Sequence, residues 1–174
     1  KKVNSIAISG KSWLTVGEDY TYSVVYSPAY ATPQNAVRWS SENPDIISID
    51  ENTGAVTVKK VGSTVIHAQL DDLTDALEVN SNLASIRPTA RADKDSVVTI
   101  KWDAIKGAVK YEVKHNDVVV QEFVEDGRES YTFVDETYKG AMEKERICYV
   151  IYVIGENGDR SGHYEYINIG PANN

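Results

Sequence analysis

The chain has 174 residues, of which 41% are hydrophobic and 25% are charged, a composition typical of a folded globular protein. Its formal charge of −8 at pH 7 argues against a nucleic-acid partner, because phosphate binding needs a basic surface. A single cysteine, Cys148, excludes an intrachain disulfide.

Short apolar runs with a period of two recur along the whole chain, which predicts β-strands. In the first half they are Ile6 to Ile8, Tyr20 to Tyr26, Val37 to Trp39, Ile47 to Ile49, Val56 to Val58, Val65 to Ala68 and Ala76 to Val79. In the second half they are Val97 to Trp102, Val109 to Lys114, Val118 to Val124, Ser130 to Val134, Arg146 to Ile154 and Tyr164 to Ile169. Glycine, proline and Asn/Asp clusters separate the runs, so the sequence predicts an all-β fold of sandwich type.

Only two segments could form short helices, Asp71 to Ala76 and Thr137 to Lys144, and neither has a sustained apolar stripe. The polar segment Asn80 to Pro88 has few large apolar residues and predicts a boundary between domains. We expect one domain at residues 1–82 and a second at 83–174. The two halves are not copies of one another, so a tandem of two different β-sandwiches is predicted rather than a repeat array.

The first half resembles the bacterial Ig-like domain, group 2. The resemblance rests on Val37-x-Trp39-Ser40-Ser41-x-Asn43-Pro44, followed by Ile49-Asp50, Thr53-Gly54-x-Val56, Val61-Gly62 and Thr64-x-Ile66-x-Ala68. It implies an Ig-like sandwich of the kind found in bacterial surface proteins and phage virion proteins, often in adhesion or display. It supplies no catalytic residues.

The second half is similar to a fibronectin type III module. The matching residues are Val98-x-Ile100-x-Trp102, Gly107-Ala108-x-x-Tyr111-x-Val113 and Tyr149-x-Ile151-x-Val153. The resemblance implies that Trp102 packs in the core and that Tyr111 and Val113 face inward. Where this family usually has a hydrogen-bonded corner tyrosine, the present chain has Ile147. Either the turn is held in another way or the alignment slips by a residue or more, and a general Ig-like sandwich is the alternative.

Candidate catalytic and metal-binding side chains are scattered. Cys148 could act as a nucleophile with His115 or His163, but it lies in a predicted strand without a nucleophile elbow. The histidines, including His67, show no zinc-ligand spacing. Acids in predicted turns suit a hard cation such as calcium, or paired carboxylate catalysis, but solvated loop acids are the expectation; they are Asp45, Asp50, Glu51, Asp71, Asp72, Asp75, Asp93 and Asp95. We therefore expect no enzyme activity, no cofactor and no metal.

Alternation predicts one candidate contact face in the second half. If Tyr149, Ile151 and Val153 point inward, the residues between them point outward, and the last strand contributes two more outward tyrosines. The predicted face consists of Val150, Tyr152, Tyr164 and Tyr166. Aromatic clusters on a sheet face often mark a contact surface, although cross-strand packing or burial against other parts of a longer chain explains them too.

The sequence thus predicts a non-catalytic module of a bacterial exported protein, extracellular or at the cell surface, used for adhesion, recognition or structural spacing. Its partners would be a protein or a glycan on a cell surface. Two alternatives stay open: a phage virion decoration protein that contacts neighbouring virion subunits, and a carbohydrate-binding accessory module. No apolar run is long enough to cross a bilayer, so no direct membrane insertion by this segment is expected, and the start at Lys1-Lys2 without Met indicates a processed or trimmed product.

Overall fold

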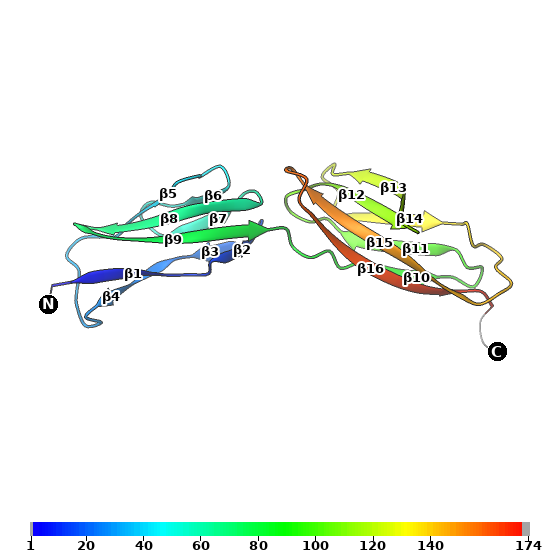
Figure 1. Ribbon diagram of the computed structural model, residues 1–174, viewed down its shortest axis with the longest axis horizontal. Helices are drawn as coiled ribbons and strands as arrows, with labels where there is room; N and C mark the ends of the chain where they lie inside the picture. Colours follow the sequence, from blue (N-terminus) through cyan, green and yellow to red (C-terminus); the bar gives the residue numbers. More distant parts are fainter. Residues whose placement is uncertain (1, 172–174) are drawn as a thin grey trace. The chain divides into compact units, whose positions relative to one another are not determined.

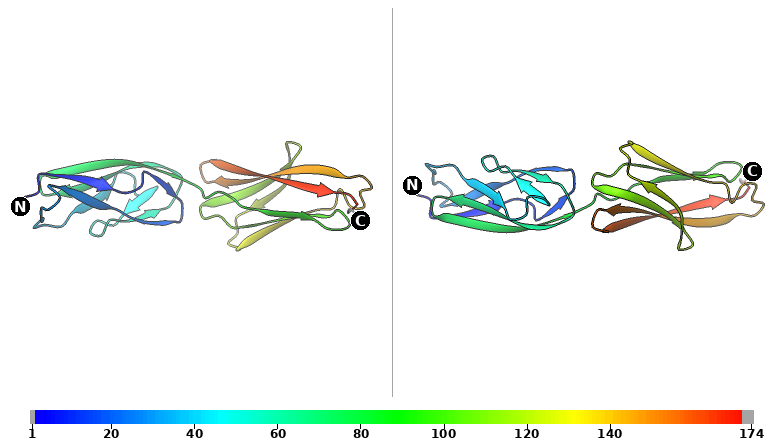
Figure 2. Two further views of the ribbon diagram at one scale, coloured as in Figure 1. Left: turned by 90° about the horizontal axis from the view of Figure 1, so that it is seen from below. Right: turned by 90° about the horizontal axis from the view of Figure 1, so that it is seen from above.

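The computed structural model describes residues 2–171, which form sixteen β-strands and no helix (Figure 1). The chain divides into two compact units between Asn82 and Leu83. Each unit consists of two stacked layers of strands, as the views in Figure 2 show. The all-β prediction and the prediction of tandem Ig-like sandwiches are confirmed.

Unit 1 contains the first nine strands. They are β1 (Ser5–Ser9), β2 (Trp13–Thr15), β3 (Asp19–Thr21), β4 (Ser23–Ser27), β5 (Arg38–Ser41), β6 (Ile47–Ile49), β7 (Ala55–Val58), β8 (Gly62–Leu70) and β9 (Leu73–Asn82). Three sheets result, with strand orders β2-β9-β8-β5, β3-β7-β6 and β1-β4. All pairings are antiparallel except that of β2 with β9.

The core of unit 1 follows the period of two in each strand. Trp39 on β5 is buried, and it pairs across the sheet with the buried Ala68 on β8. Tyr22 lies between β3 and β4, where the chain passes from one sheet to another, and its ring meets Trp39 edge-on at a centroid distance of 6.4 Å. The run Tyr20 to Tyr26, predicted as one strand, is therefore two strands in different sheets. Trp13 is 66% exposed and does not belong to the core.

Unit 2 contains the last seven strands. They are β10 (Thr89–Ala92), β11 (Val98–Asp103), β12 (Ala108–His115), β13 (Val118–Val124), β14 (Ser130–Asp135), β15 (Glu145–Gly155) and β16 (Arg160–Ile169). Two fully antiparallel sheets face each other, with strand orders β10-β11-β14 and β13-β12-β15-β16.

An aromatic cluster fills one part of the core of unit 2. Trp102 lies 5.7 Å from Tyr111 and 5.9 Å from Tyr131 between ring centroids, and all three residues are buried. Val113 is also buried. The structure thus places Trp102, Tyr111 and Val113 as the family resemblance implies.

Three segments that the sequence left open are settled by the structure. Neither segment considered as a helix is helical: Asp71 and Asp72 form the turn between β8 and β9, and residues 137–144 form turns between β14 and β15. A helix cannot form in the first segment, because β9 starts directly after the turn and pairs with all of β8. The polar boundary segment is also not a solvated linker, since Leu83 and Ile86 are buried.

Candidate functional site

The four predicted contact residues come from β15 and β16, which are neighbours in the four-stranded sheet. Val150 lies directly opposite Tyr164, while Tyr152 lies opposite Gly162. Ile151, between Val150 and Tyr152, is buried, and the register places Tyr164 and Tyr166 on the same side as Val150, so all four predicted side chains share the outer face of the sheet. The structure brings the predicted residues together.

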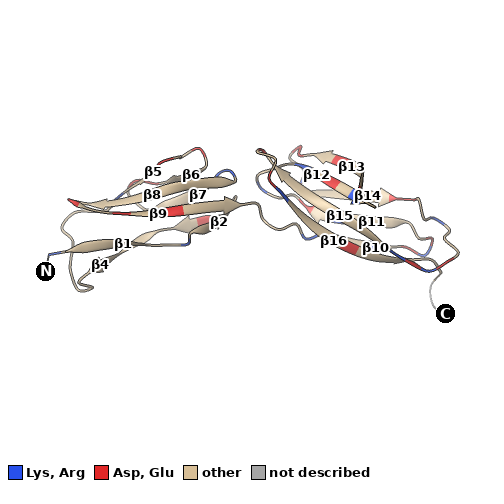
Figure 3. Ribbon diagram, in the orientation of Figure 1, with Lys and Arg blue, Asp and Glu red and all other residues tan. Residues whose placement is uncertain are grey.

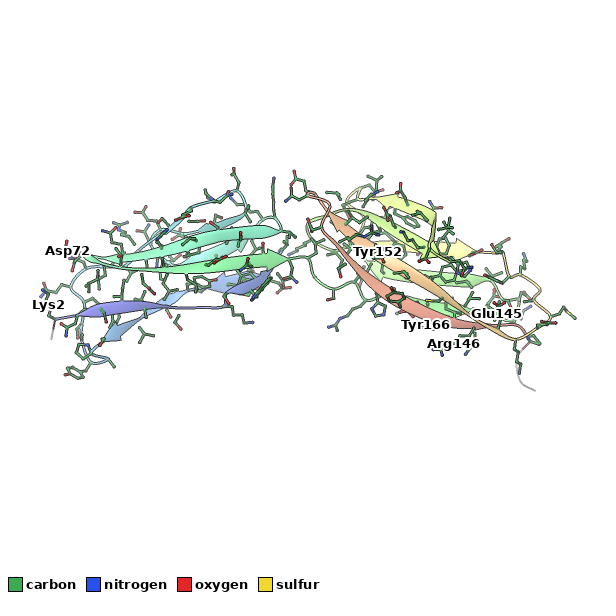
Figure 4. The ribbon with its side chains drawn as sticks, viewed as in Figure 1. Lys2, Asp72, Glu145, Arg146, Tyr152 and Tyr166 are labelled. Atoms are coloured by element: carbon green, nitrogen blue, oxygen red, sulfur yellow. The ribbon has the colours of Figure 1, made fainter. Side chains whose placement is uncertain are left out.

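Tyr164 and Tyr166 are the open part of this face. Their exposed fractions are 58% and 57%, and within residues 2–171 neither hydroxyl has a hydrogen bond. The guanidinium carbon of Arg146 lies 4.7 Å from the centroid of the Tyr166 ring, close enough for a cation–π contact (Figure 4). Val150 is half-buried beside them.

Tyr152, by contrast, is held in a network of charged side chains. The Arg160 guanidinium carbon lies 3.9 Å from its ring centroid and the Lys114 Nζ lies at 5.6 Å. The ring covers Gly162, where a Cβ atom would come within 2.6 Å of the ring carbon Cε1. Tyr152 is therefore a packed element of the sheet, and the open face reduces to Val150, Tyr164, Tyr166 and Arg146.

Glu112 on β12 anchors the same network. Its carboxylate forms ion pairs with Lys110 at 3.0 Å and with Arg160 at 3.3 Å, although the residue is buried. The hydrogen bond from Lys110 lowers the pKa of Glu112, and the charges of Lys110, Arg160 and Lys114 act in the same direction against the opposing effect of burial. Blue and red segments are interspersed over this unit in Figure 3. Arg160 is thereby fixed over Tyr152.

Sequence reasoning missed Arg146, Arg160 and Lys114. Arg146 precedes Cys148 and Val150 by two and four positions, so the same alternation that selected Val150 could have selected it. Arg160 and Lys114 were not detectable in this way, since their contacts depend on which strands are neighbours.

Cys148 and the histidines do not form a catalytic pair in the described part of the chain. The Nδ1 atom of His115 meets the backbone carbonyl oxygen of Cys148 at 2.8 Å, and its Nε2 atom lies 2.6 Å from the Tyr138 hydroxyl. His67 contacts Glu42 and His163 contacts Glu165. Each histidine thus has its own structural partner.

Two of the loop acids considered as calcium ligands, Asp50 and Asp93, cap turns. Asp50 Oδ1 accepts hydrogen bonds from the backbone N–H and the hydroxyl of Thr53, both at 2.8 Å, and these bonds lower the pKa of Asp50. Asp75 lies on β9 rather than in the bend with Asp71, and its carboxylate accepts the N–H of Ile8 at 2.7 Å. Over residues 2–171, no three His, Cys, Asp or Glu side chains gather as a metal site would require.

The described residues contain no helix long and apolar enough to cross a membrane.

Ile147, which stands where a corner tyrosine was expected from the family resemblance, is buried. Two residues later, the Tyr149 hydroxyl donates to Asp135 Oδ2 at 2.6 Å and ties β15 to the end of β14. Burial and this hydrogen bond raise the pKa of Tyr149.

Three solved structures align with most of the chain at low sequence identity. The chain is 14% identical to the structure of domains 5-6 of the S-layer protein SbsC, with a TM-score of 0.39. The alignment covers 95% of this chain and 97% of the SbsC chain. For the Yersinia pseudotuberculosis adhesin InvE the sequence identity is 11% and the TM-score is 0.39, and the alignment covers 94% of this chain and 59% of the adhesin chain. For Sidekick-1 immunoglobulin domains 1-5 the sequence identity is 10% and the TM-score is 0.34, and the alignment covers 98% of this chain and 40% of the Sidekick-1 chain. The chain therefore spans less than two thirds of the adhesin and Sidekick-1 structures.

No curated protein matches the chain in sequence. The family model described as the bacterial Ig-like domain (group 2) matches residues 2–81, which is nearly all of unit 1, and confirms the first of the two family resemblances.

Proposed function

We propose that this chain is a non-catalytic recognition module of an exported bacterial protein, displayed outside the cell. The family match over residues 2–81 supports a bacterial module of Ig-like type. Unit 2 is proposed to be a fibronectin type III-like domain, because Trp102, Tyr111 and Val113 occupy the core positions that this resemblance implies. Folds of this kind do not specify a partner, so the partner must be inferred from the surface.

The observation that carries the recognition role is the pair Tyr164 and Tyr166 on the outer face of β16. Both rings are more than half exposed, on a regular strand, beside Val150 and Arg146. Tyrosine and arginine are enriched where proteins bind one another, since each combines a large apolar surface with hydrogen-bonding groups. The partner is therefore proposed to be a protein surface, with the two tyrosines as its anchors.

The test uses fluorescently labelled whole chain on two arrays, one of immobilised extracellular and cell-surface proteins and one of glycans. The double variant Tyr164→Ser/Tyr166→Ser removes the anchors. The matched control is Tyr30→Ser, which makes the same chemical change at a tyrosine that is 66% exposed in unit 1. We expect the whole chain to bind a protein and the double variant to bind it at least about tenfold more weakly, a difference of about 1.4 kcal/mol.

The control should bind like the unchanged chain. Binding to no protein, or protein binding that the double variant retains, would contradict the proposal. Binding confined to glycans and lost in the double variant would assign the same face to carbohydrate instead and remove the protein partner.

A further inference from the structure

A second surface feature of unit 2 lies on the opposite sheet and is independent of the proposed tyrosine face. It is a shallow hollow of about 330 Å³ on the outer side of β10 and β11. Its lining residues are Thr89, Ala90, Arg91, Thr99 and Lys101. None of the lining residues is acidic, although the chain carries 26 Asp and Glu against 18 Lys and Arg.

The strand register gives these residues a checkerboard arrangement. Thr89 lies opposite Lys101, and Arg91 lies opposite Thr99. The residue between Thr99 and Lys101 is the buried Ile100, so the four polar side chains face outward. Arg91 and Lys101 are diagonal neighbours, which in an antiparallel pair are about 7–8 Å apart. One anionic group between them can contact both cations.

Neither cation has an ion pair or a hydrogen bond in the part of the chain that the structure describes. Other cations of this unit do have carboxylate partners; for example, Lys110 pairs with Glu112 and Glu122. Two like charges side by side repel each other, and a bound anion would remove that repulsion. The next acids along the strands, Asp93 and Asp103, do not line the hollow, and Asp93 Oδ1 already accepts two backbone N–H groups.

Hydrogen-bond donors complete the site. The hydroxyls of Thr89 and Thr99 have no partner within residues 2–171, and each can donate one hydrogen bond. Arg91 offers a planar fork of N–H donors that matches two oxygens of one group, while Lys101 acts as a point charge. We propose that this hollow binds an oxyanion group, held by Arg91 and Lys101 with Thr89 and Thr99 as neutral donors.

The test is a titration of the ¹⁵N-labelled whole chain, followed by the amide signals of residues 89–91 and 99–101. The probes are inorganic phosphate, inorganic sulfate and glucuronate, each at constant ionic strength set with sodium chloride. We expect saturable shifts at these amides with a millimolar dissociation constant or tighter. A preference for phosphate and sulfate assigns a tetrahedral group, and a preference for glucuronate assigns a carboxylate.

The variant Arg91→Gln/Lys101→Gln should raise the dissociation constant at least about tenfold. The control Lys94→Gln/Lys139→Gln removes the same net charge from exposed side chains elsewhere in the unit and should leave it within about twofold. Thr99→Val, which removes only a hydroxyl, should weaken binding by a smaller factor. The tyrosine double variant should bind the anion unchanged, so the two proposals fail separately.

Shifts that grow linearly for all three anions, or that fall equally in both double-charge variants, would overturn the proposal and leave only a diffuse charge effect.

Discussion

Tyr164 and Tyr166 resemble the core tyrosines in sequence pattern but differ from them in environment. Serine at both positions should change the free energy of unfolding by less than about 1 kcal/mol, because exposed side chains contribute little to stability. Tyr149→Ser, in the neighbouring strand, removes a fully buried aromatic ring and should cost about 3–5 kcal/mol. Urea denaturation of the double variant and of Tyr149→Ser checks this. A loss of several kcal/mol from the exposed pair would show that these rings are covered.

We expect the free energy of unfolding to depend on pH through the ionisation of Glu112. Its pKa in the folded state is lowered, first by the hydrogen bond from Lys110, so the ionised form stabilises the fold above the unfolded-state pKa. This contribution is lost as the pH falls through the folded-state pKa. Glu112→Gln should therefore cost about 1–2 kcal/mol near neutral pH and progressively less under acid conditions.

Urea denaturation at a series of pH values measures this gap between the variant and the unchanged chain. A gap that stays constant from neutral to acid pH would show that the charge of Glu112 has no role.

The parity of residues along each strand was readable from the sequence. It put Val150 and Tyr164 on one face, as the structure shows. The burial of Trp102 was implied by the family resemblance rather than by parity. Parity did not reveal that Tyr152 is packed under Arg160, since that contact joins two strands through a turn whose geometry the pattern leaves open.

The turn between β6 and β7 depends on a close approach at Gly54. Its φ is +73°, and a Cβ atom there would lie 2.5 Å from the carbonyl oxygen of Tyr22. Gly54→Ala should cost about 2–4 kcal/mol, from the strained backbone and the clash together. Gly127→Ala is the matched control, since its φ is +84° but no atom lies within 4 Å of the added Cβ.

The control should cost only about 1 kcal/mol, from the backbone alone. Thermal unfolding of both variants gives the comparison. Equal losses would mean that the approach of Tyr22 to Gly54 is not a tight one.

The side chain of Tyr138 helps to fasten the connection between β14 and β15 to β12. Because a carbonyl oxygen only accepts, His115 Nδ1 donates to Cys148, and in the neutral ring Nε2 accepts from the Tyr138 hydroxyl. Tyr138→Phe should cost about 1 kcal/mol and speed amide hydrogen exchange in residues 136–144. Met142→Ala, at a side chain that is 89% exposed in the same segment, should alter neither. Unchanged exchange in Tyr138→Phe would show that the segment is held by other contacts.

Most strands were predictable from the sequence, although β2 and β10 were not among the predicted runs. Sheet membership was not predictable. The run from Tyr20 to Tyr26 alternates without interruption, yet β3 pairs with β7 and β4 pairs with β1. The change of sheet occurs at Tyr22, whose ring packs on Trp39, and such a long-range contact leaves no local pattern. The helix considered at Thr137 to Lys144 failed for a similar reason, because Tyr138 is fixed from β12.

For the whole molecule, the sequence indicated two different sandwiches but described their junction poorly. The segment Asn80 to Pro88 looked like a polar linker, yet Ser81, Leu83 and Ile86 are buried. The large apolar residues in it, Leu83 and Ile86, are both buried, which a count of polar residues does not show. The oxyanion hollow was not predictable either, because Arg91 and Lys101 meet only through the pairing of β10 with β11.

The central claim is that unit 2 is a self-contained sandwich that carries the tyrosine face by itself. The direct measurement is a ¹H–¹⁵N correlation spectrum of residues 83–174 alone, compared with that of the whole chain. We expect a dispersed spectrum in which the amide signals of Val150, Tyr164 and Tyr166 keep the chemical shifts that they have in the whole chain. A collapsed spectrum, or displaced signals across β15 and β16, would contradict it.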